Sequence, residues 1–495
     1  MAMTALTAMA TDYTERLLVL VNGEGTEQEA TISVTEHDGL YTLNLKNFVL
    51  MNGDQPMAVG NVEVADIVPA IYDGTVVLRA SRDVVITDGD LPDVLLWMGP
   101  MLGALPVDIV ATIKGDQLYA LINLDLSDIL HQVIEVRFNK DFIDGKGLLI
   151  PNGNFELWHA SSDKYEEPNA WHSFESATGN FASLAGHHLE KSDKGRNDSS
   201  CARIYSTSLF GVIANGTMTT GRLNAGSISA DNTSNNAYMD MSLTGEDNVD
   251  GNGDPFYVPL NVKPDSLTVW VRFKQGQATA AHPYATVSAA ITDGTYYQDP
   301  QDKEYKNVIA TAANREIAET GDQWTRLSIP FEYTTSNLEP KALLVTISTN
   351  ADPGAGSSGD EVLVDDIALV YNACLSSLSI DGFATDQYEY EVEANTKIED
   401  LTYTVDGKGA YVTMSETTDD NGRRAEIAVI SADLSTTTVY TLKFKNTGTD
   451  IRQAVTTTDI QPAYYHPDGR QATAPARGLY IYRQANGQTV KVFFK

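Results

Sequence analysis

The sequence predicts an all-β protein made of several domains. Short runs of alternating apolar and polar residues recur along the chain, and turn sequences such as Glu36-His-Asp-Gly39 and Lys114-Gly-Asp-Gln117 separate many of them. Between residues 152 and 371 no apolar pattern of helical period extends beyond about three turns. A chain of 495 residues is longer than one hydrophobic core usually supports, so we expect about two to four domains.

The first residues, Met1 to Ala10, are small and apolar and end in Ala8-Met9-Ala10, an A-x-A cleavage pattern. The basic segment and most of the apolar core of a signal peptide are missing. We interpret residues 1–10 as the remnant of a signal peptide, with a mature chain that begins near Thr11. The protein is therefore expected to be exported, to the cell surface or the extracellular space.

Residues 11–140 predict a small barrel, because eight alternating strands are enough to close one. A segment with Trp97 at residues 91–105 interrupts them and predicts a short helix or a lid over the barrel end. The segment resembles the calycin-like barrels, which can carry an apolar ligand; the alternative is an interior filled by side chains. The predicted strands are 14–21, 30–35, 41–50, 59–65, 74–80, 107–114, 118–124 and 134–138.

A linker at residues 141–147 leads to a second predicted domain, residues 148–371. It opens with Asn152-Gly-Asn-Phe-Glu-Leu-Trp158 and closes with Asp360-Glu-Val-Leu-Val-Asp-Asp-Ile-Ala-Leu-Val-Tyr371, and both segments read as short strands that carry carboxylates. This outline is typical of a β-sandwich whose first and last strands meet. Glu156 and Asp366 would then come together, and two such carboxylates need a hard cation or a shared proton.

The opening Asn-Gly-x-Phe-Glu followed by Trp, and the closing Val-Asp-Asp-Ile-x-Leu, resemble the calcium-carrying jelly-roll carbohydrate-binding modules. The stretch from about 150 to 371 is similar to the putative carbohydrate metabolism domain of secreted Bacteroidetes proteins. The resemblance implies a structural Ca²⁺ held by Glu156 and Asp366, with Asn154 nearby and Asp365 as the second choice. It also implies a polysaccharide or oligosaccharide partner.

Aromatic side chains are candidates for sugar contacts, because sugar rings stack on aromatic rings while polar neighbours bind the hydroxyls. We expect Trp171 and Tyr297 to be the main ones, followed by Trp158 and Tyr257. Trp270 and Trp324 lie inside alternating strands, and that position predicts core packing for both.

Catalytic residues are not selected by any spacing. Glycoside hydrolysis needs two carboxylates about 5 to 10 Å apart, and the many acids include Glu166, Glu167, Glu175, Glu190, Asp240 and Asp299. His187 and His188, with His159 and His172, are candidate ligands of a transition metal, although scattered imidazoles in one loop usually face solvent. Asp250-Gly-Asn-Gly-Asp254 places oxygen ligands at alternate residues, but a turn explains it equally well because the EF-hand glycine and glutamate are missing.

The third and last parts are also β-rich. Residues 372–448 have short Thr-rich strands that suit a small immunoglobulin-like sandwich. Residues 460–495 resemble the carboxy-terminal sorting tails of type IX secretion, and a plain terminal hairpin is the alternative. Cys201 and Cys374 are too few for a disulfide framework, and the sequence leaves open whether they form one bridge.

Taken with the resemblance, these features predict an exported glycan-binding protein at the cell envelope. The alternatives are a glycoside hydrolase or polysaccharide lyase with its site on the concave jelly-roll face, and a structural adhesin or surface-assembly protein. An aromatic platform without an acid pair favours binding, two facing carboxylates favour hydrolysis, and a sheet without pocket or exposed rings favours the adhesin.

Overall fold

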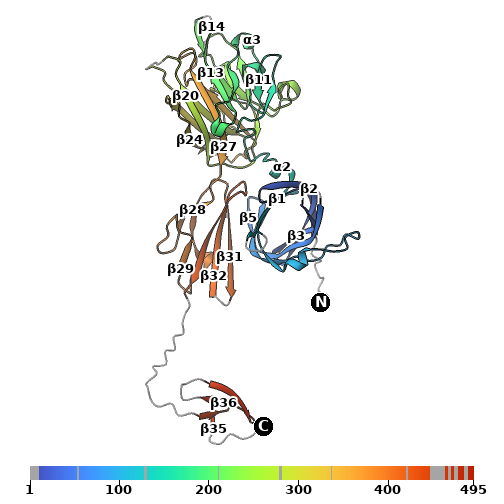
Figure 1. Ribbon diagram of the computed structural model, residues 1–495. Helices are drawn as coiled ribbons and strands as arrows, with labels where there is room; N and C mark the ends of the chain where they lie inside the picture. The colour runs from blue at the N-terminus through green and yellow to red at the C-terminus, as the bar shows by residue number, and fades with distance from the viewer. Residues whose placement is uncertain are drawn as a thin grey trace, which may run out of the picture. The chain divides into compact units, whose positions relative to one another are not determined.

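The computed structural model confirms an all-β chain with several sheets (Figure 1). The structure describes residues 10–52, 55–127, 131–209, 211–277, 281–335, 337–419, 422–445, 463–466, 470–472, 478–483 and 489–494. The signal-peptide remnant predicted at residues 1–10 therefore lies almost wholly outside the described residues. In the described part of the chain, no helix is long and apolar enough to cross a membrane.

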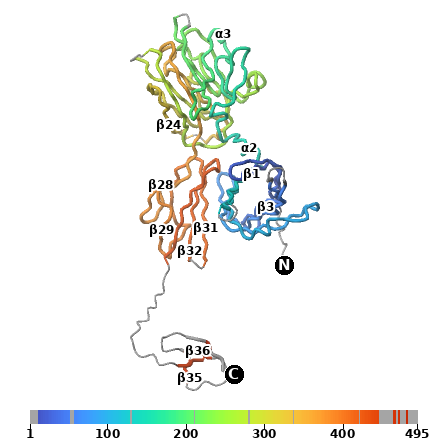
Figure 2. Tube along the Cα trace, viewed as in Figure 1, coloured from blue at the N-terminus to red at the C-terminus, as the bar shows by residue number. Residues whose placement is uncertain are grey.

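The N-terminal domain is one sheet of nine antiparallel strands in the order β4-β3-β2-β1-β9-β8-β7-β6-β5. The tube in Figure 2 shows that this sheet curls into a barrel, and an isolated bridge between Asn61 and Thr87 joins β4 to the segment that follows β6. The strands are β1 Ala10–Val21, β2 Glu24–His37, β3 Leu40–Asn52, β4 Gln55–Ile67, β5 Pro69–Tyr72, β6 Thr75–Val85, β7 Ala104–Lys114, β8 Gln117–Leu126 and β9 Gln132–Phe138.

The barrel has one strand more than the sequence predicted. The additional strand β5 is short and begins with a proline, so the alternation that revealed the other strands is hard to see in it. The short helix expected between residues 91 and 105 is confirmed as η1, Gly99–Leu102. Apolar side chains from the barrel strands form a buried core, among them Leu17, Leu43 and Phe138.

The central domain is a sandwich of two antiparallel sheets. One sheet has the order β12-β13-β27-β20-β24, and the other has the order β16-β26-β21-β23-β25 with β19 also paired to β26. Alternate residues of both sheets, such as Val269 of β20 and Val287 of β21, fill the core between them. The strands of the two sheets are β12 Leu189–Ser192, β13 Cys201–Tyr205, β16 Thr217–Thr219, β19 Val258–Pro259, β20 Ser266–Lys274, β21 Ala285–Thr292, β23 Val308–Ile317, β24 Thr325–Pro330, β25 Glu332–Tyr333, β26 Ala342–Ser348 and β27 Glu361–Val370.

The central domain also contains shorter strands and helices outside its two main sheets. Two hairpins and one three-stranded sheet are formed by β10 Trp158–Ala160 with β11 Glu166–Pro168, by β14 Thr207–Leu209 with β15 Val212–Ala214, and by β17 Arg222–Ala225, β18 Asn235–Met239 and β22 Tyr297–Asp299. The short helices of this domain are η2 Phe174–Ser176, α3 Ala182–Ala185, η3 Arg196–Asp198 and η4 Gly245–Asp247, whereas α2 Lys140–Ile143 packs against β1 and β9 of the barrel.

The opening and closing segments of the sandwich do meet. The backbone N–H of Ile367 in β27 donates to the carbonyl of Gly153 at 2.8 Å. A bulge makes this possible, because the register between β20 and β27 shifts between Thr268 and Trp270. The predicted contact between these distant segments is therefore confirmed. The opening segment is not the predicted strand, because residues 151–154 form a turn and residues 155–157 have no regular secondary structure.

Residues beyond the sandwich form two further β-structures. A two-stranded and a four-stranded sheet contain β28 Cys374–Leu378, β29 Glu389–Val392, β30 Tyr403–Asp406, β31 Tyr411–Asp419, β32 Gly422–Ile430 and β33 Thr437–Phe444, with the short helix η5 Ile398–Asp400. A last sheet, in a separate compact unit, contains β34 Ala463–Tyr465, β35 Gln471–Ala472, β36 Gly478–Arg483 and β37 Thr489–Phe494. The predicted tail at 460–495 includes β34 to β37 and also residues outside the described ones; its sorting role stays a prediction.

Candidate functional site

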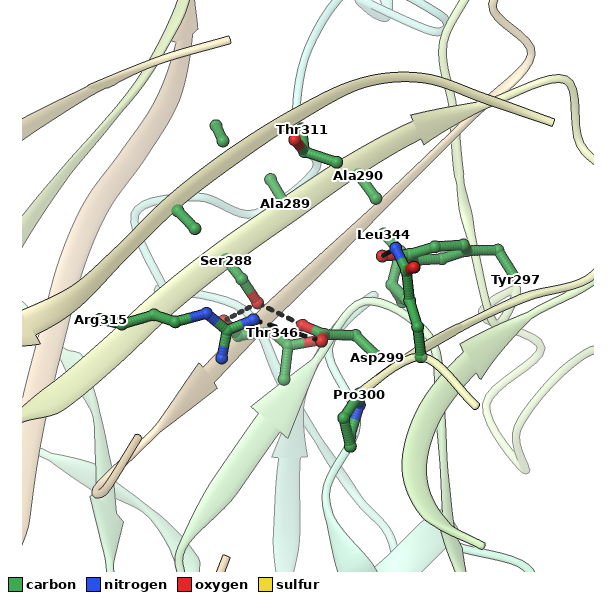
Figure 3. Close-up of a pocket in the computed structure, with 13 residues that line it drawn as sticks. Ser288, Ala289, Ala290, Tyr297, Asp299, Pro300, Thr311, Arg315, Leu344 and Thr346 are labelled. Carbon is green, nitrogen blue, oxygen red and sulfur yellow. Dashed lines mark hydrogen bonds and ion pairs between the residues drawn. The ribbon is translucent and has the colours of Figure 1, made fainter. Parts of the chain in front are cut away.

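A cavity of about 350 Å³ opens on the face of the six-stranded sheet that points away from the sandwich core (Figure 3). Ligand pockets in proteins usually hold about 300 to 1,000 Å³, so its size suits a small ligand. The cavity is lined by Ser288, Ala289, Ala290, Tyr297, Asp299, Pro300, Gln301, Thr311, Ala312, Ala313, Arg315, Leu344 and Thr346.

The strand alternation explains why this face is hollow. Val287 and Ile291 of β21 point into the core, so Ser288 and Ala290 point to the other side of the sheet. Ser288 pairs with Ala313 of β23, so two small side chains lie next to each other across the strands. Small residues at these outward positions leave open space above the sheet.

One wall of the cavity is polar. The hydroxyl of Ser288 donates a hydrogen bond of 2.6 Å to Asp299 Oδ2, and Arg315 Nη2 lies 3.6 Å from Asp299 Oδ1. The Asp299 side chain is 17% exposed, whereas that of Arg315 is 54% exposed. The carboxylate is therefore held in place inside the cavity, while the guanidinium stands at its rim.

The other wall is aromatic. Tyr297 is only 3% exposed, its ring packs edge-on against Tyr305 at 5.3 Å, and its hydroxyl accepts a hydrogen bond of 3.3 Å from Gln301 Nε2. Burial raises the pKa of Tyr297, so the phenol stays neutral and can donate its own proton. Beside it, Tyr296 is 38% exposed and stacks on Tyr238.

Among the described residues that line the cavity, Asp299 is the one carboxylate. The sequence placed Asp299 among many acids and did not select it. Ser288 and Arg315 were missed altogether. The sequence shows Ser288 among small and apolar residues in Ala285–Thr292, and only the structure shows that the whole strand is buried, which makes a hydrogen-bonded serine there informative.

The aromatic residues predicted to contact sugars differ in their burial and in whether they line the cavity. Trp171 is fully buried and its indole Nε1 donates to the carbonyl of Pro151 at 3.2 Å. Its ring packs on Phe155 in the sandwich core, so the prediction of an available ring at Trp171 is wrong. Tyr297 does line the cavity. Trp158 is half-buried against the core, and Tyr257 packs against the cluster that contains Tyr297.

Trp270 and Trp324 correct a second expectation. Neither belongs to the buried core, and both are half-buried. The Arg196 guanidinium lies 3.8 Å from the centre of the Trp270 ring, and that of Arg272 lies 6.0 Å from the Trp324 ring. Trp270 lies on the face of β20 opposite to the core, whereas Trp324 precedes β24 and is not part of a strand.

The residues predicted to hold Ca²⁺ meet one common loop. Glu156 Oε1 accepts a hydrogen bond of 2.9 Å from the Ser200 amide, and Asp366 forms an ion pair with Arg196. Asp365 Oδ2 accepts from the Arg196 amide at 2.7 Å, and burial raises the pKa of the Asp365 carboxyl. Asn154 is exposed. The calcium assignment stays a prediction.

A second group of side chains can hold a metal. His159, Glu167 and Asp250 place ligand atoms within 4.8 Å of one another, the one such group of three among the described residues. None of them lines the cavity.

Part of the chain is similar to a known family. Residues 9–141 match the calycin-like beta-barrel domain. The expectation of a calycin-like barrel at the N-terminus is thereby confirmed. No curated protein matches the sequence.

Two solved structures share a distant likeness in fold. One is described as "a putative glycoside hydrolase" from Bacteroides thetaiotaomicron, with 12% identity and a TM-score of 0.35 over 66% of this chain and 92% of that chain. The other carries the same description and comes from Bacteroides vulgatus, with 18% identity and a TM-score of 0.31 over 45% of this chain and 94% of that chain.

Proposed function

We propose that the protein is an exported glycan-binding protein of the cell envelope and that the cavity above the six-stranded sheet is its sugar site. The observation that carries the proposal is the combination of one held carboxylate, one guanidinium and one buried tyrosine around a cavity of suitable size. Neutral sugars are recognised by such a mixture, because their hydroxyls need donors and acceptors while their C–H faces need apolar contact.

The lining residues have distinct roles in this proposal. Asp299 accepts hydrogen bonds from sugar hydroxyls, and Arg315 donates to neighbouring hydroxyl oxygens. Ser288 fixes the orientation of Asp299. The phenol of Tyr297 offers a donor, and Ala290, Ala313 and Pro300 supply apolar contact.

Binding without catalysis is favoured over hydrolysis because of the number of carboxylates among the described residues that line the cavity. Hydrolysis of a glycosidic bond generally requires two carboxylates, one as general acid and one as base or nucleophile. The described lining residues provide only Asp299. Export and envelope location are proposed from the A-x-A pattern at Ala8-Met9-Ala10 and from the resemblance of the central domain to modules of secreted proteins.

The proposal is tested by screening the full chain against an array of neutral oligosaccharides and measuring any hit by calorimetry. Asp299→Ala and Arg315→Ala should each weaken binding roughly tenfold or more, since each loses a hydrogen bond to a charged group. Matched controls are Asp322→Ala and Arg326→Ala, exposed residues that do not line the cavity. Both controls should bind like the unaltered protein.

Three results would contradict the proposal. Release of reducing sugar from a bound oligosaccharide would show a hydrolase. Binding that survives Asp299→Ala and Arg315→Ala would place the sugar elsewhere. A lack of binding to every glycan on a broad array would favour the structural adhesin.

A further inference from the structure

We propose that His159, Glu167 and Asp250, with His172 beside them, form a binding site for a divalent transition metal of the zinc class. The strand register sets up the site, because His159 of β10 pairs directly with Glu167 of β11 and both side chains share one face of the hairpin. Asp250 arrives from the loop closed by the bridge between Val249 and Pro255. The ligand atoms of the three residues lie within 4.8 Å of one another.

In each of the two carboxylates, one oxygen accepts hydrogen bonds from neighbouring groups and the other oxygen accepts none. Glu167 Oε1 accepts from the Ser173 amide at 2.5 Å, from the Ser173 hydroxyl at 2.6 Å and from the Ser176 hydroxyl at 3.1 Å. Asp250 Oδ1 accepts from the amides of Asn252 and Asp254 at 2.9 and 2.8 Å. Glu167 Oε2 and Asp250 Oδ2 are buried and have no hydrogen-bond partner.

In each of the two imidazoles, one ring nitrogen donates a hydrogen bond and the other is left with a free lone pair. His172 Nε2 lies 3.3 Å from the carbonyl oxygen of Pro255, which can only accept, so this nitrogen carries the proton. His172 Nδ1 is then a lone pair; it is buried without a hydrogen-bond partner and lies 3.6 Å from Asp250 Oδ2.

His159 Nδ1 lies 3.1 Å from Asn169 Oδ1, and a proton donated there leaves the Nε2 lone pair facing Asp250 Oδ2 at 3.2 Å. Metal-binding histidines typically donate their second N–H to such an oxygen, which fixes the ring for the metal.

A cation accounts for this arrangement better than hydrogen bonds within the group. Ligand atoms of Glu167, Asp250 and His159 converge there, and His172 Nδ1 lies 3.6 Å from Asp250 Oδ2. All are electron-pair donors in the neutral tautomers described above. Glu167 is 1% exposed and His172 is 0% exposed, so water has little access to them. Leaving such groups buried and unpaired is costly, whereas one metal ion held by His159, Glu167 and Asp250 would satisfy these three together, with His172 beside it.

The donor set indicates the class of metal. Imidazole nitrogens suit zinc and its transition-metal neighbours, while Ca²⁺ takes oxygen ligands. The His159 side chain, the most exposed of the four, is only 11% exposed. A closed site of this kind is typical of structural zinc. The metal would tie the β10–β11 hairpin to the loop before β19.

Metal content and thermal unfolding of the full chain test the inference. Protein stripped with a chelator and returned to Zn²⁺ should bind about one equivalent by elemental analysis and unfold at a higher temperature. His159→Gln and Asp250→Asn should each weaken zinc binding at least about 100-fold, and Asn169→Ala, which removes only the partner of His159, about 10-fold to 100-fold. His282→Gln, at an exposed histidine, is the matched control and should behave like the unaltered protein.

Unaltered protein that takes up no zinc and gains no thermal stability from it would overturn the inference, and that measurement needs no variant to fold. A gain with Ca²⁺ but not with Zn²⁺ would overturn the metal class. Zinc binding that persists in both ligand variants would place the metal elsewhere. Glycan binding at the Asp299 cavity is measured separately, so either proposal can fail without the other.

Discussion

Cys201 illustrates how burial controls the chemistry of one side chain. It lies fully buried in β13, and burial raises the pKa of its thiol to about 11. Cys374 is partly exposed, and burial together with Asp406 also raises its pKa. The two thiols are free, so they do not form the bridge that the sequence left open.

We therefore predict that Cys201 does not react with a thiol reagent at pH 8 while the protein is folded. The thiolate is the reactive form, and a thiol of pKa about 11 supplies almost none at that pH. Reagent counting should find at most the slow Cys374 in native protein and both thiols in guanidinium chloride. The variant Cys374→Ser isolates Cys201; fast labelling of this variant in its folded state would contradict the prediction.

The residue types in the candidate site could be predicted from the sequence better than their exposure. Tyr297 was selected because aromatic rings bind sugars, and it does line the cavity. Trp171 was selected for the same reason and is buried, because its indole N–H finds the Pro151 carbonyl inside the domain. Chemistry can be inferred from residue type, whereas the direction of a loop side chain depends on contacts that the sequence does not display.

At the scale of elements, the Gly153–Ile367 contact holds the ends of the sandwich together. A Cβ added to Gly153 would lie 2.1 Å from the backbone oxygen of Ile367. Because that neighbour is backbone of a core strand, it cannot move aside as a flexible side chain would.

We predict that Gly153→Ala destabilises the central domain by roughly 3 kcal/mol, as overpacking against fixed atoms does. Thermal or denaturant unfolding measures the change. Gly251→Ala is the control, since a methyl group there would meet nothing within 4 Å. Equal stability of the two variants would show that the contact between the opening and closing segments is not rigid.

The predicted Ca²⁺ site at Glu156, Asp366 and Asn154 can be tested on the same domain. After chelation, Ca²⁺ should raise the unfolding temperature by mass action, and Glu156→Gln should abolish that gain. Arg196 forms an ion pair with Asp366. Arg196→Gln should therefore increase the gain in unfolding temperature with Ca²⁺, because it leaves the Asp366 carboxylate available to the ion. A stripped protein that gains nothing from Ca²⁺ would refute the calcium prediction, whatever Zn²⁺ does.

The two candidate metal sites differ in how much of each could be predicted from the sequence. Glu156 and Asp366 stand in motifs that the sequence displays, and the two segments meet as predicted, although the opening one is a turn and loop instead of a strand. His159, Glu167, His172 and Asp250 come from short hairpins and loops without clear periodicity, so their histidines looked like scattered loop residues. Only the pairing of β10 with β11 and the fold of the Asp250 loop bring them together.

At the scale of the whole molecule, the net charge of -33 should select among glycans. An anionic oligosaccharide approaching the protein meets long-range repulsion, and at the cavity it also meets the Asp299 carboxylate. A neutral oligosaccharide is repelled by neither, and in the proposed site its hydroxyls donate hydrogen bonds to Asp299. Repulsion of this kind reaches about 30 Å at 0.01 M salt but only about 3 Å at 1 M salt.

We therefore predict that the affinity for a neutral glycan stays constant between about 0.01 and 1 M salt, whereas a uronate or sulfated glycan binds weakly at low salt and better at high salt. Calorimetric titration of a matched neutral and acidic oligosaccharide pair measures this directly. Asp299→Asn should improve the acidic ligand more than the neutral one, because it removes the nearest negative charge and keeps the shape of the side chain. Tighter binding of the acidic glycan at low salt would instead indicate that Arg315, exposed at the rim, dominates the local field over the charge of the molecule.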